Sequence, residues 1–166
     1  MSPSLDVYHI LRYLGYDGQV FVGHDPDVDG EYIVLRDTGG NANPRYLRDE
    51  FRIQIMCKTE REDYLAGYNL LTEIKNLLLG LWTYTVEEVE TPVGRGKRIA
   101  DKIYVEFVER DTEVTDVISA TDYIRFLLVS DVSLISQDEN NRYMFTINFR
   151  IMREEKQDTG NRITIS

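Results

Sequence analysis

The chain has 166 residues and a mass of 19.4 kDa, enough for one domain with a buried core. Its net charge of −10 argues against tight wrapping of nucleic acid, and its 42% hydrophobic content excludes a disordered chain. The sequence contains no apolar run near the ~20 residues that a membrane helix needs. A single cysteine, Cys57, excludes an internal disulfide framework and indicates a reducing compartment.

The N-terminal segment predicts a helix. Ser2 is a typical N-cap residue and Pro3 suits the first helical position. Apolar residues then recur with helical spacing at Val7, Ile10, Leu11 and Leu14. Short apolar runs at residues 20–22 and 32–35 predict two strands.

Two loops are predicted around the second of these strands. The first, residues 23–30, is acidic and rich in turn residues. The second, residues 37–49, is rich in Gly, Asn and Pro. It leads into residues 51–58, where apolar and polar side chains alternate. That alternation predicts a strand with one face on the core.

A second helix of about 20 residues is predicted to follow. Thr59 and Glu62 have the spacing of a capping box, and Gly80 supplies a C-terminal stop. Between them runs an apolar stripe that is typical of core packing, made of Leu70, Leu71, Ile74, Leu77 and Leu78.

The second half of the chain predicts mainly strands. Residues 84–86 and 103–108 have strand character, with a basic turn at residues 91–98 between them. Longer strands are predicted at residues 123–135 and 142–153. In the last of these the apolar side chains share one face, namely Tyr143, Phe145, Ile147, Phe149 and Ile151.

Together these elements predict an α+β fold. Two helices and five to seven strands with short connections favour a mixed, mostly antiparallel sheet with both helices packed on one face. We expect a single domain over residues 1–166, with residues 83–122 as an inserted segment.

Two motifs suggest ligands but are incomplete. Asp25, Asp27 and Asp29 copy the first half of a calcium loop, but Arg36 occupies the position of the required acid. A solvated acidic turn is therefore favoured, with a calcium-binding module as the alternative. Residues 94–98 lack the preceding glycine and the following Ser or Thr of a phosphate loop.

No catalytic or cofactor-binding residue is predicted. The two histidines, His9 and His24, accompany no Ser or Cys in a recognisable nucleophile motif, and Cys57 lies on the apolar face of its strand. We therefore expect a protein that is not an enzyme, with a small enzyme of unknown type as an alternative that would need a pocket of convergent polar groups.

Two segments are candidate contact surfaces. Long loops between strands often have a function of their own, and Tyr and Arg are enriched at interfaces. The 37–49 loop is interpreted either as a wide hairpin connection or as a contact arm with anchors at Arg45, Tyr46, Leu47 and Arg48. The basic turn offers a contact for an acidic partner through Arg95, Lys97 and Arg98.

Several segments, in their order and spacing, resemble siphophage tail terminator proteins, which are often labelled minor capsid proteins. The segments are YIVLRDTGG (residues 32–40), PRYL (44–47), FRIQI (51–55), the helix at 64–80 and DENNRYMFTINF (138–149). The resemblance covers about residues 1–82 and 123–153. Residues 83–122 depart from it and are interpreted as a decoration or a partner-specific contact.

The resemblance implies a structural protein of the virion tail, made in the host bacterial cytoplasm. Such proteins form a homohexameric ring on the head-proximal end of the tail tube. The ring stops polymerisation of the tube protein and provides the surface that joins a head or neck completion protein. DNA passes through its lumen without specific binding. The alternative is a head completion or tail completion protein at the head–tail interface.

Overall fold

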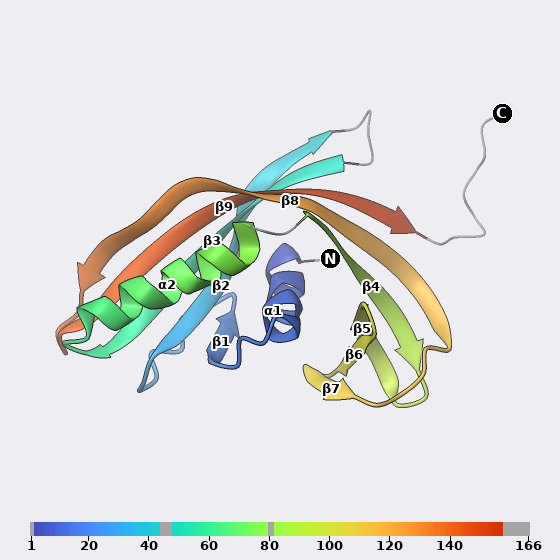
Figure 1. Cartoon of the computed structure of the whole chain (residues 1–166), viewed down its shortest axis with the longest axis horizontal. Coiled ribbons are helices and arrows are strands. Elements are labelled where there is room, and N and C mark those ends of the chain that lie inside the picture. The colour runs from blue at the N-terminus through green and yellow to red at the C-terminus, as the bar shows by residue number, and fades with distance from the viewer. Residues whose placement is uncertain (1, 44–47, 80–81, 158–166) are drawn as a thin grey trace.

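The computed structural model describes residues 2–43, 48–79 and 82–157. Within these ranges all nine strands join in one strongly curved sheet, accompanied by two helices (Figure 1). The helices are α1 (Pro3–Tyr13) and α2 (Tyr64–Leu79). The strands are β1 (Gln19–Val22), β2 (Tyr32–Asn43), β3 (Arg48–Arg61), β4 (Trp82–Thr91), β5 (Gly94–Ile99), β6 (Lys102–Val105), β7 (Val108–Arg110), β8 (Asp116–Gln137) and β9 (Arg142–Gln157). The predicted α+β class is confirmed, although the sheet dominates the structure.

The sheet is mixed and mostly antiparallel. Its strand order is β1-β2-β3-β9-β8-β4-β5-β6-β7. Only β1 and β2 pair in parallel among the described strands, and the remaining neighbours are antiparallel. The last strand in sequence, β9, therefore lies between β3 and β8 near the middle of the sheet.

Both helices lie on the concave side of the sheet (Figure 1) and contribute to the same core. The predicted face of β9 is confirmed, because Phe145, Ile147, Phe149 and Ile151 are all buried. Burying side chains of this size contributes roughly 1.5–3 kcal/mol each. The helices fill the concavity with apolar side chains at the predicted spacing, namely Val7, Ile10 and Leu11 of α1 and Leu70, Leu71, Ile74 and Leu78 of α2. Ser2 caps α1 as predicted, because its hydroxyl accepts from the Leu5 amide at 3.4 Å.

The predicted start of the second helix is wrong. Thr59 is a residue of β3, which continues to Arg61, and α2 begins only at Tyr64. The Thr59 hydroxyl accepts from the Tyr143 amide of β9 at 2.9 Å instead of capping the helix. Pairing with β9 thus extends the strand through the capping-box sequence and shortens α2 to 16 residues.

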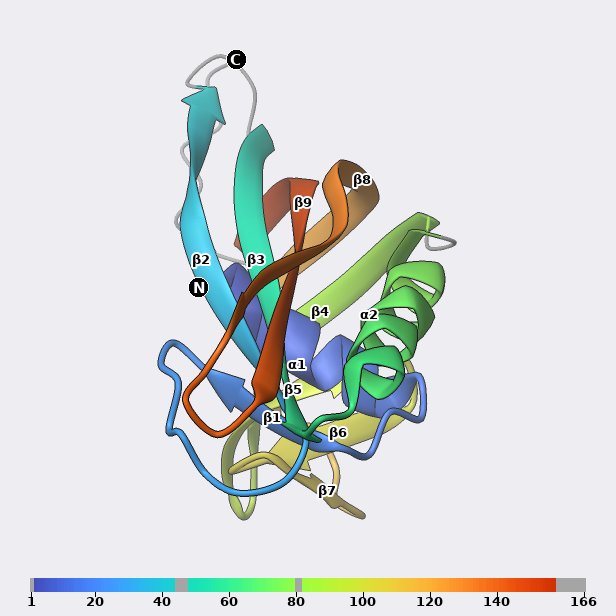
Figure 2. The same ribbon diagram turned by 90° about the vertical axis from the view of Figure 1, so that its left-hand side faces the viewer.

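The loop predicted at residues 37–49 is also different in the structure. β2 continues to Asn43, whose backbone lies opposite Arg48 at the start of β3. Gly39 has φ of 107° beside a register shift, so the glycine serves a bulge within the strand. The C-terminal end of β2 and the N-terminal start of β3 extend away from the two helices (Figure 2). The predicted anchors Arg45, Tyr46 and Leu47 lie outside the described residues.

Residues 82–110 add four strands to the sheet beyond β8. The predicted basic turn is mostly strand, because the chain turns at Pro92 and Val93 and the basic residues belong to β5. The single strand predicted at 103–108 is divided into β6 and β7 by a turn in which Glu106 and Phe107 both have positive φ. This part of the chain curls around α1 on the concave side (Figure 1).

Candidate functional site

The three basic residues predicted as a contact on residues 91–98 each pair with an acid of the same chain. Arg98 donates to both carboxylate oxygens of Glu87 at 2.9 Å. Arg95 donates to Glu90 at 3.1 Å, and Lys97 donates to the buried carboxylate of Asp6. Only the Arg95 side chain among the three is largely exposed, at 66%. Much of the positive charge of β5 is therefore used inside the molecule.

Asp6 is the central acid of this region. It is completely buried, and its second oxygen accepts from the hydroxyl of Tyr123. Burial and then the charge of Asp6 raise the pKa of Tyr123, so the phenol stays protonated and donates. The Asp6 carboxylate thereby joins three elements that are distant in sequence, namely α1, β5 through Lys97 and β8 through Tyr123.

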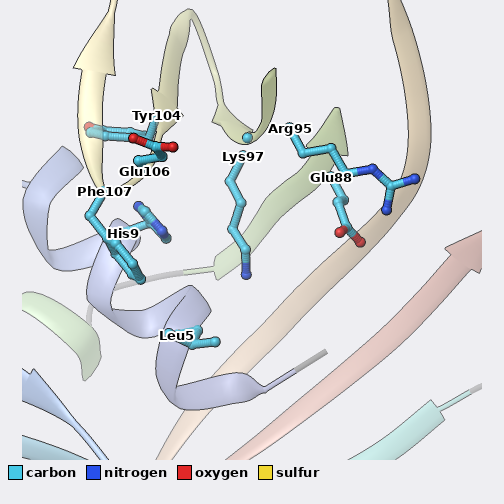
Figure 3. Close-up of a pocket in the computed structure, with 9 residues that line it drawn as sticks. Leu5, His9, Glu88, Arg95, Lys97, Tyr104, Glu106 and Phe107 are labelled. Atoms are coloured by element: carbon cyan, nitrogen blue, oxygen red, sulfur yellow. The ribbon is translucent and has the colours of Figure 1, made fainter. Parts of the chain in front are cut away.

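A cavity of about 170 Å³ lies beside the Asp6–Lys97 ion pair, between α1 and the strands β5 and β6 (Figure 3). His9 lines it and is only 4% exposed. Its ring stacks on Phe107 at 5.5 Å between centroids and lies 5.2 Å from the ring of Tyr104. The Nδ1 atom of His9 has no hydrogen-bond partner among the described residues. Burial, and then the charge of Lys97, lowers the pKa of His9 to about 4.

These values predict how stability depends on pH. The folded pKa of His9 lies below the ordinary value of 6.5, so the unfolded chain takes up the proton first. The contribution of His9 is complete above pH 6.5 and is lost as the pH falls toward 4. The full loss is on the order of 3 kcal/mol. We expect His9→Phe, measured by urea unfolding at pH 7 and pH 4.5, to lose clearly less stability between the two than the wild type. Equal losses in both proteins would contradict this assignment.

Two acids of the loop at residues 23–30 contact other side chains of the same chain. Asp25 accepts from the Tyr32 hydroxyl, and Asp27 pairs with Lys58. Lys58 is only 5% exposed and also lies 3.4 Å from a carboxylate oxygen of Asp138. Burial acts to lower the pKa of Lys58, but its acidic partners outweigh burial and raise it. Within the described residues, no three acidic, His or Cys side chains are grouped as a metal site requires.

Arg142 fastens the same loop to the sheet. Its guanidinium is buried and donates to the backbone oxygens of Thr59, Val28 and Gly30 at 2.7, 2.8 and 2.6 Å. It also lies over the Tyr32 ring at 5.5 Å. The sequence did not predict that the side chains of Lys58 and Arg142 are buried. Each lies in a strand with alternating apolar and polar residues, at a position where a polar side chain is normally exposed to solvent.

Of the predicted arm residues, only Arg48 is among the described ones. It begins β3, and its backbone lies between Asn43 of β2 and Glu154 of β9. The structure therefore places Arg48 in the β2–β3 hairpin and the Arg95–Arg98 segment on β5, across the sheet from it. None of the described helices is long and apolar enough to span a membrane.

The chain is similar to a known protein family over part of its length. Residues 10–88 match the family model described as bacteriophage tail terminator protein. A search of curated proteins found no match. The family match supports the resemblance seen in the sequence and indicates a structural role in the assembly of the phage tail.

Proposed function

Since residues 10–88 match the bacteriophage tail terminator family, we propose that this protein forms a ring that caps the tail tube and stops its polymerisation. The family match is the observation that carries the proposal. In the proposed ring, six copies bind the head-proximal end of a siphophage tail tube. The face of the ring that points away from the tube joins a head or neck completion protein.

The acidity of the chain is compatible with DNA passing through the ring. Tight DNA binding depends on Lys and Arg that neutralise phosphates and release counterions. In this chain 29 acidic residues outnumber 19 basic ones, and the three basic residues of β5 pair with acids of the same chain. A duplex would therefore slide through such a lumen without being held.

Ring closure requires each copy to use two different surfaces, one for each neighbour. We propose the β2–β3 hairpin as one of them, with Arg45, Tyr46, Leu47 and Arg48, which follow β2 in the sequence, as anchors. Arg95, Lys97 and Arg98 remain proposed as a second contact, of which Arg95 is the most exposed.

The proposal is tested by electron microscopy of lysates from a phage that lacks this gene. We expect overlong tails of variable length beside free heads, because no ring stops the tube. A plasmid copy of the wild-type gene should restore tails of uniform length. Tails of normal length lying unattached beside heads would contradict the terminator role and move the protein to the neck.

A further inference from the structure

The cavity between α1 and the strands β5 and β6 carries acceptor groups that lack a cationic partner among the described residues. We call this space of about 170 Å³ the His9 cavity. The Nδ1 atom of His9 has no hydrogen-bond partner in the described part of the chain, although the residue is buried. Glu106 makes no ion pair there, and Glu88 accepts from the Ser119 hydroxyl at 3.4 Å. A buried nitrogen without a partner is costly, so a donor from outside the chain is favoured at this place.

The two cations on the wall of the His9 cavity are already paired with acids that lie outside it. Lys97 donates to Asp6, and the Nε atom of Arg95 donates to Glu90 at 3.1 Å. His9 adds no positive charge at pH 7, because its pKa is lowered to about 4. The carboxylates on the wall therefore face the cavity without a balancing cation, and the site favours a positively charged group.

Aromatic rings suit the His9 cavity to a guanidinium in particular. The His9 ring stacks on Phe107, with 5.5 Å between ring centroids, and lies 5.2 Å from the ring of Tyr104. Figure 3 shows these rings and Glu106 on one side of the cavity and Glu88 on the other. A guanidinium is planar, stacks on aromatic faces and donates to carboxylates from several N–H groups, whereas an ammonium is a compact, strongly hydrated charge. The cavity therefore fits arginine better than lysine.

The turn that forms one wall of the cavity is strained. Val105 pairs with Val108, so Glu106 and Phe107 make a two-residue hairpin turn, with φ of 51° and 66°. Turns of this kind favour Asn and Gly, because positive φ is costly for a bulky residue. The strain holds the Phe107 ring against His9 and places Glu106 at the cavity. Backbone strain of this kind is concentrated at sites that bind ligands.

The β2–β3 hairpin lies at the same end of the sheet as the His9 cavity but on the opposite flank. β2 and β4 run in the same direction, and through β9 and β8 the start of β3 at Arg48 is level with Thr85 of β4. Glu88 is three residues further along β4, or about 10 Å, in the direction in which β2 runs. Figure 1 shows the hairpin at the top of the molecule and β5, β6 and β7 at the bottom.

We propose that the His9 cavity binds an arginine side chain from the β2–β3 hairpin of a second copy of this chain. The inference rests on the proposed ring, in which one flank of each copy faces the opposite flank of the next. When copies stand side by side about an axis along the strands, the hairpin of one comes to the level of the cavity of its neighbour. The hairpin segment supplies Arg45 and Arg48. The guanidinium lies between the two glutamates and donates to Nδ1 of His9.

Charge reversal tests the contact in the assembled tail. A phage that lacks this gene is supplied with a plasmid copy carrying Glu88→Lys and Glu106→Lys. We expect overlong tails, because lysines on the cavity wall repel the arginine, while circular dichroism and the melting temperature of the pure variant stay at wild-type values. The control, Asp111→Lys with Glu113→Lys, makes the same charge change at two exposed positions outside the cavity and should give tails of uniform length.

Rescue by the opposite reversal identifies the hairpin as the occupant. Arg45→Glu with Arg48→Glu should also give overlong tails, and all four substitutions in one chain should restore uniform length, because each contact again joins opposite charges. Uniform tails from the cavity reversal alone would contradict the proposal. So would a combined variant whose tails are no more uniform than those of either reversal alone.

Photocrosslinking tests the contact without changing charge. Benzoylphenylalanine replaces Phe107, whose ring is 54% exposed, and purified tails are irradiated and digested. We expect a covalent dimer in which the crosslinked peptide contains Arg45 or Arg48. The control places the same group at Val93, which is 61% exposed at the β4–β5 turn, and should not capture that peptide.

The crosslinking outcomes separate this inference from the proposed function. A crosslink from position 107 to the tube protein would overturn the choice of occupant. Uniform tails without a crosslink to the hairpin would overturn the contact and leave the terminator role intact. Failure of the terminator role itself would be seen as unchanged tail length in the gene deletion.

Discussion

Asp6→Ala is expected to lower the free energy of unfolding by about 3–5 kcal/mol, the range found when one partner of a buried ion pair is removed. The Asp6 side chain is fully buried, and that of Lys97 is 16% exposed. Removing the carboxylate leaves the ammonium of Lys97 and the hydroxyl of Tyr123 without their shared acceptor. Urea unfolding at pH 7 measures the effect.

Two comparisons sharpen this result. Asp131→Ala removes an exposed carboxylate that pairs with Lys75 at 3.1 Å, and we expect little change, since exposed ion pairs contribute little. Asp6→Leu combined with Lys97→Met removes both charges and should recover much of the loss. A small effect of Asp6→Ala, similar to that of Asp131→Ala, would show that the buried pair does not hold α1 to β5 and β8.

Arg142→Met is expected to cost about 3–5 kcal/mol, because it removes three charged hydrogen bonds and leaves backbone carbonyls without a donor. Two of these carbonyls, of Val28 and Gly30, belong to the acidic loop. We therefore expect faster proteolytic cleavage within residues 23–30 in addition to a lower urea midpoint.

Arg95→Met is the matched control for this prediction. Its side chain is 66% exposed and contacts Glu90, so neither the midpoint nor the cleavage of the loop should change. An Arg142→Met protein with wild-type resistance to proteolysis in residues 23–30 would contradict the fastening role. Comparing the two variants distinguishes the general effect of replacing an arginine by methionine from the loss of the specific contacts that Arg142 makes.

Part of the candidate site could be predicted from the sequence. The sequence predicts residues 37–49 as a loop that is either a hairpin connection or a contact arm; the structure shows a β2–β3 hairpin there, and the contact stays a prediction. Asp25, Asp27 and Asp29 are predicted as a solvated acidic turn, and the sequence did not indicate that Asp27 pairs with Lys58 and lies near Arg142. The sequence also did not show that residues 126–137 of β8 have no partner on the side away from β9 among the described strands, because a missing neighbour leaves no local pattern.

The sequence by itself determined which faces of the elements are buried. In β9 the alternation from Tyr143 to Ile151 marks the core face, and in α2 the leucine stripe does the same. These patterns are local, because a repeat of 2 or 3.6 residues fixes one apolar face wherever the element lies. The family resemblance rested on the same local segments.

Only the tertiary structure decided which elements meet. Asp6 and Lys97 are 91 residues apart, and Arg142 is 114 residues from Val28. Pairing with β9 extends β3 past Thr59 of the predicted capping box. Pairing with each other extends β2 to Asn43 and starts β3 at Arg48, within the predicted loop. Hydrogen bonds and ion pairs between distant segments outweighed local propensity in each case, because burial leaves a polar group only the partners that the fold brings to it.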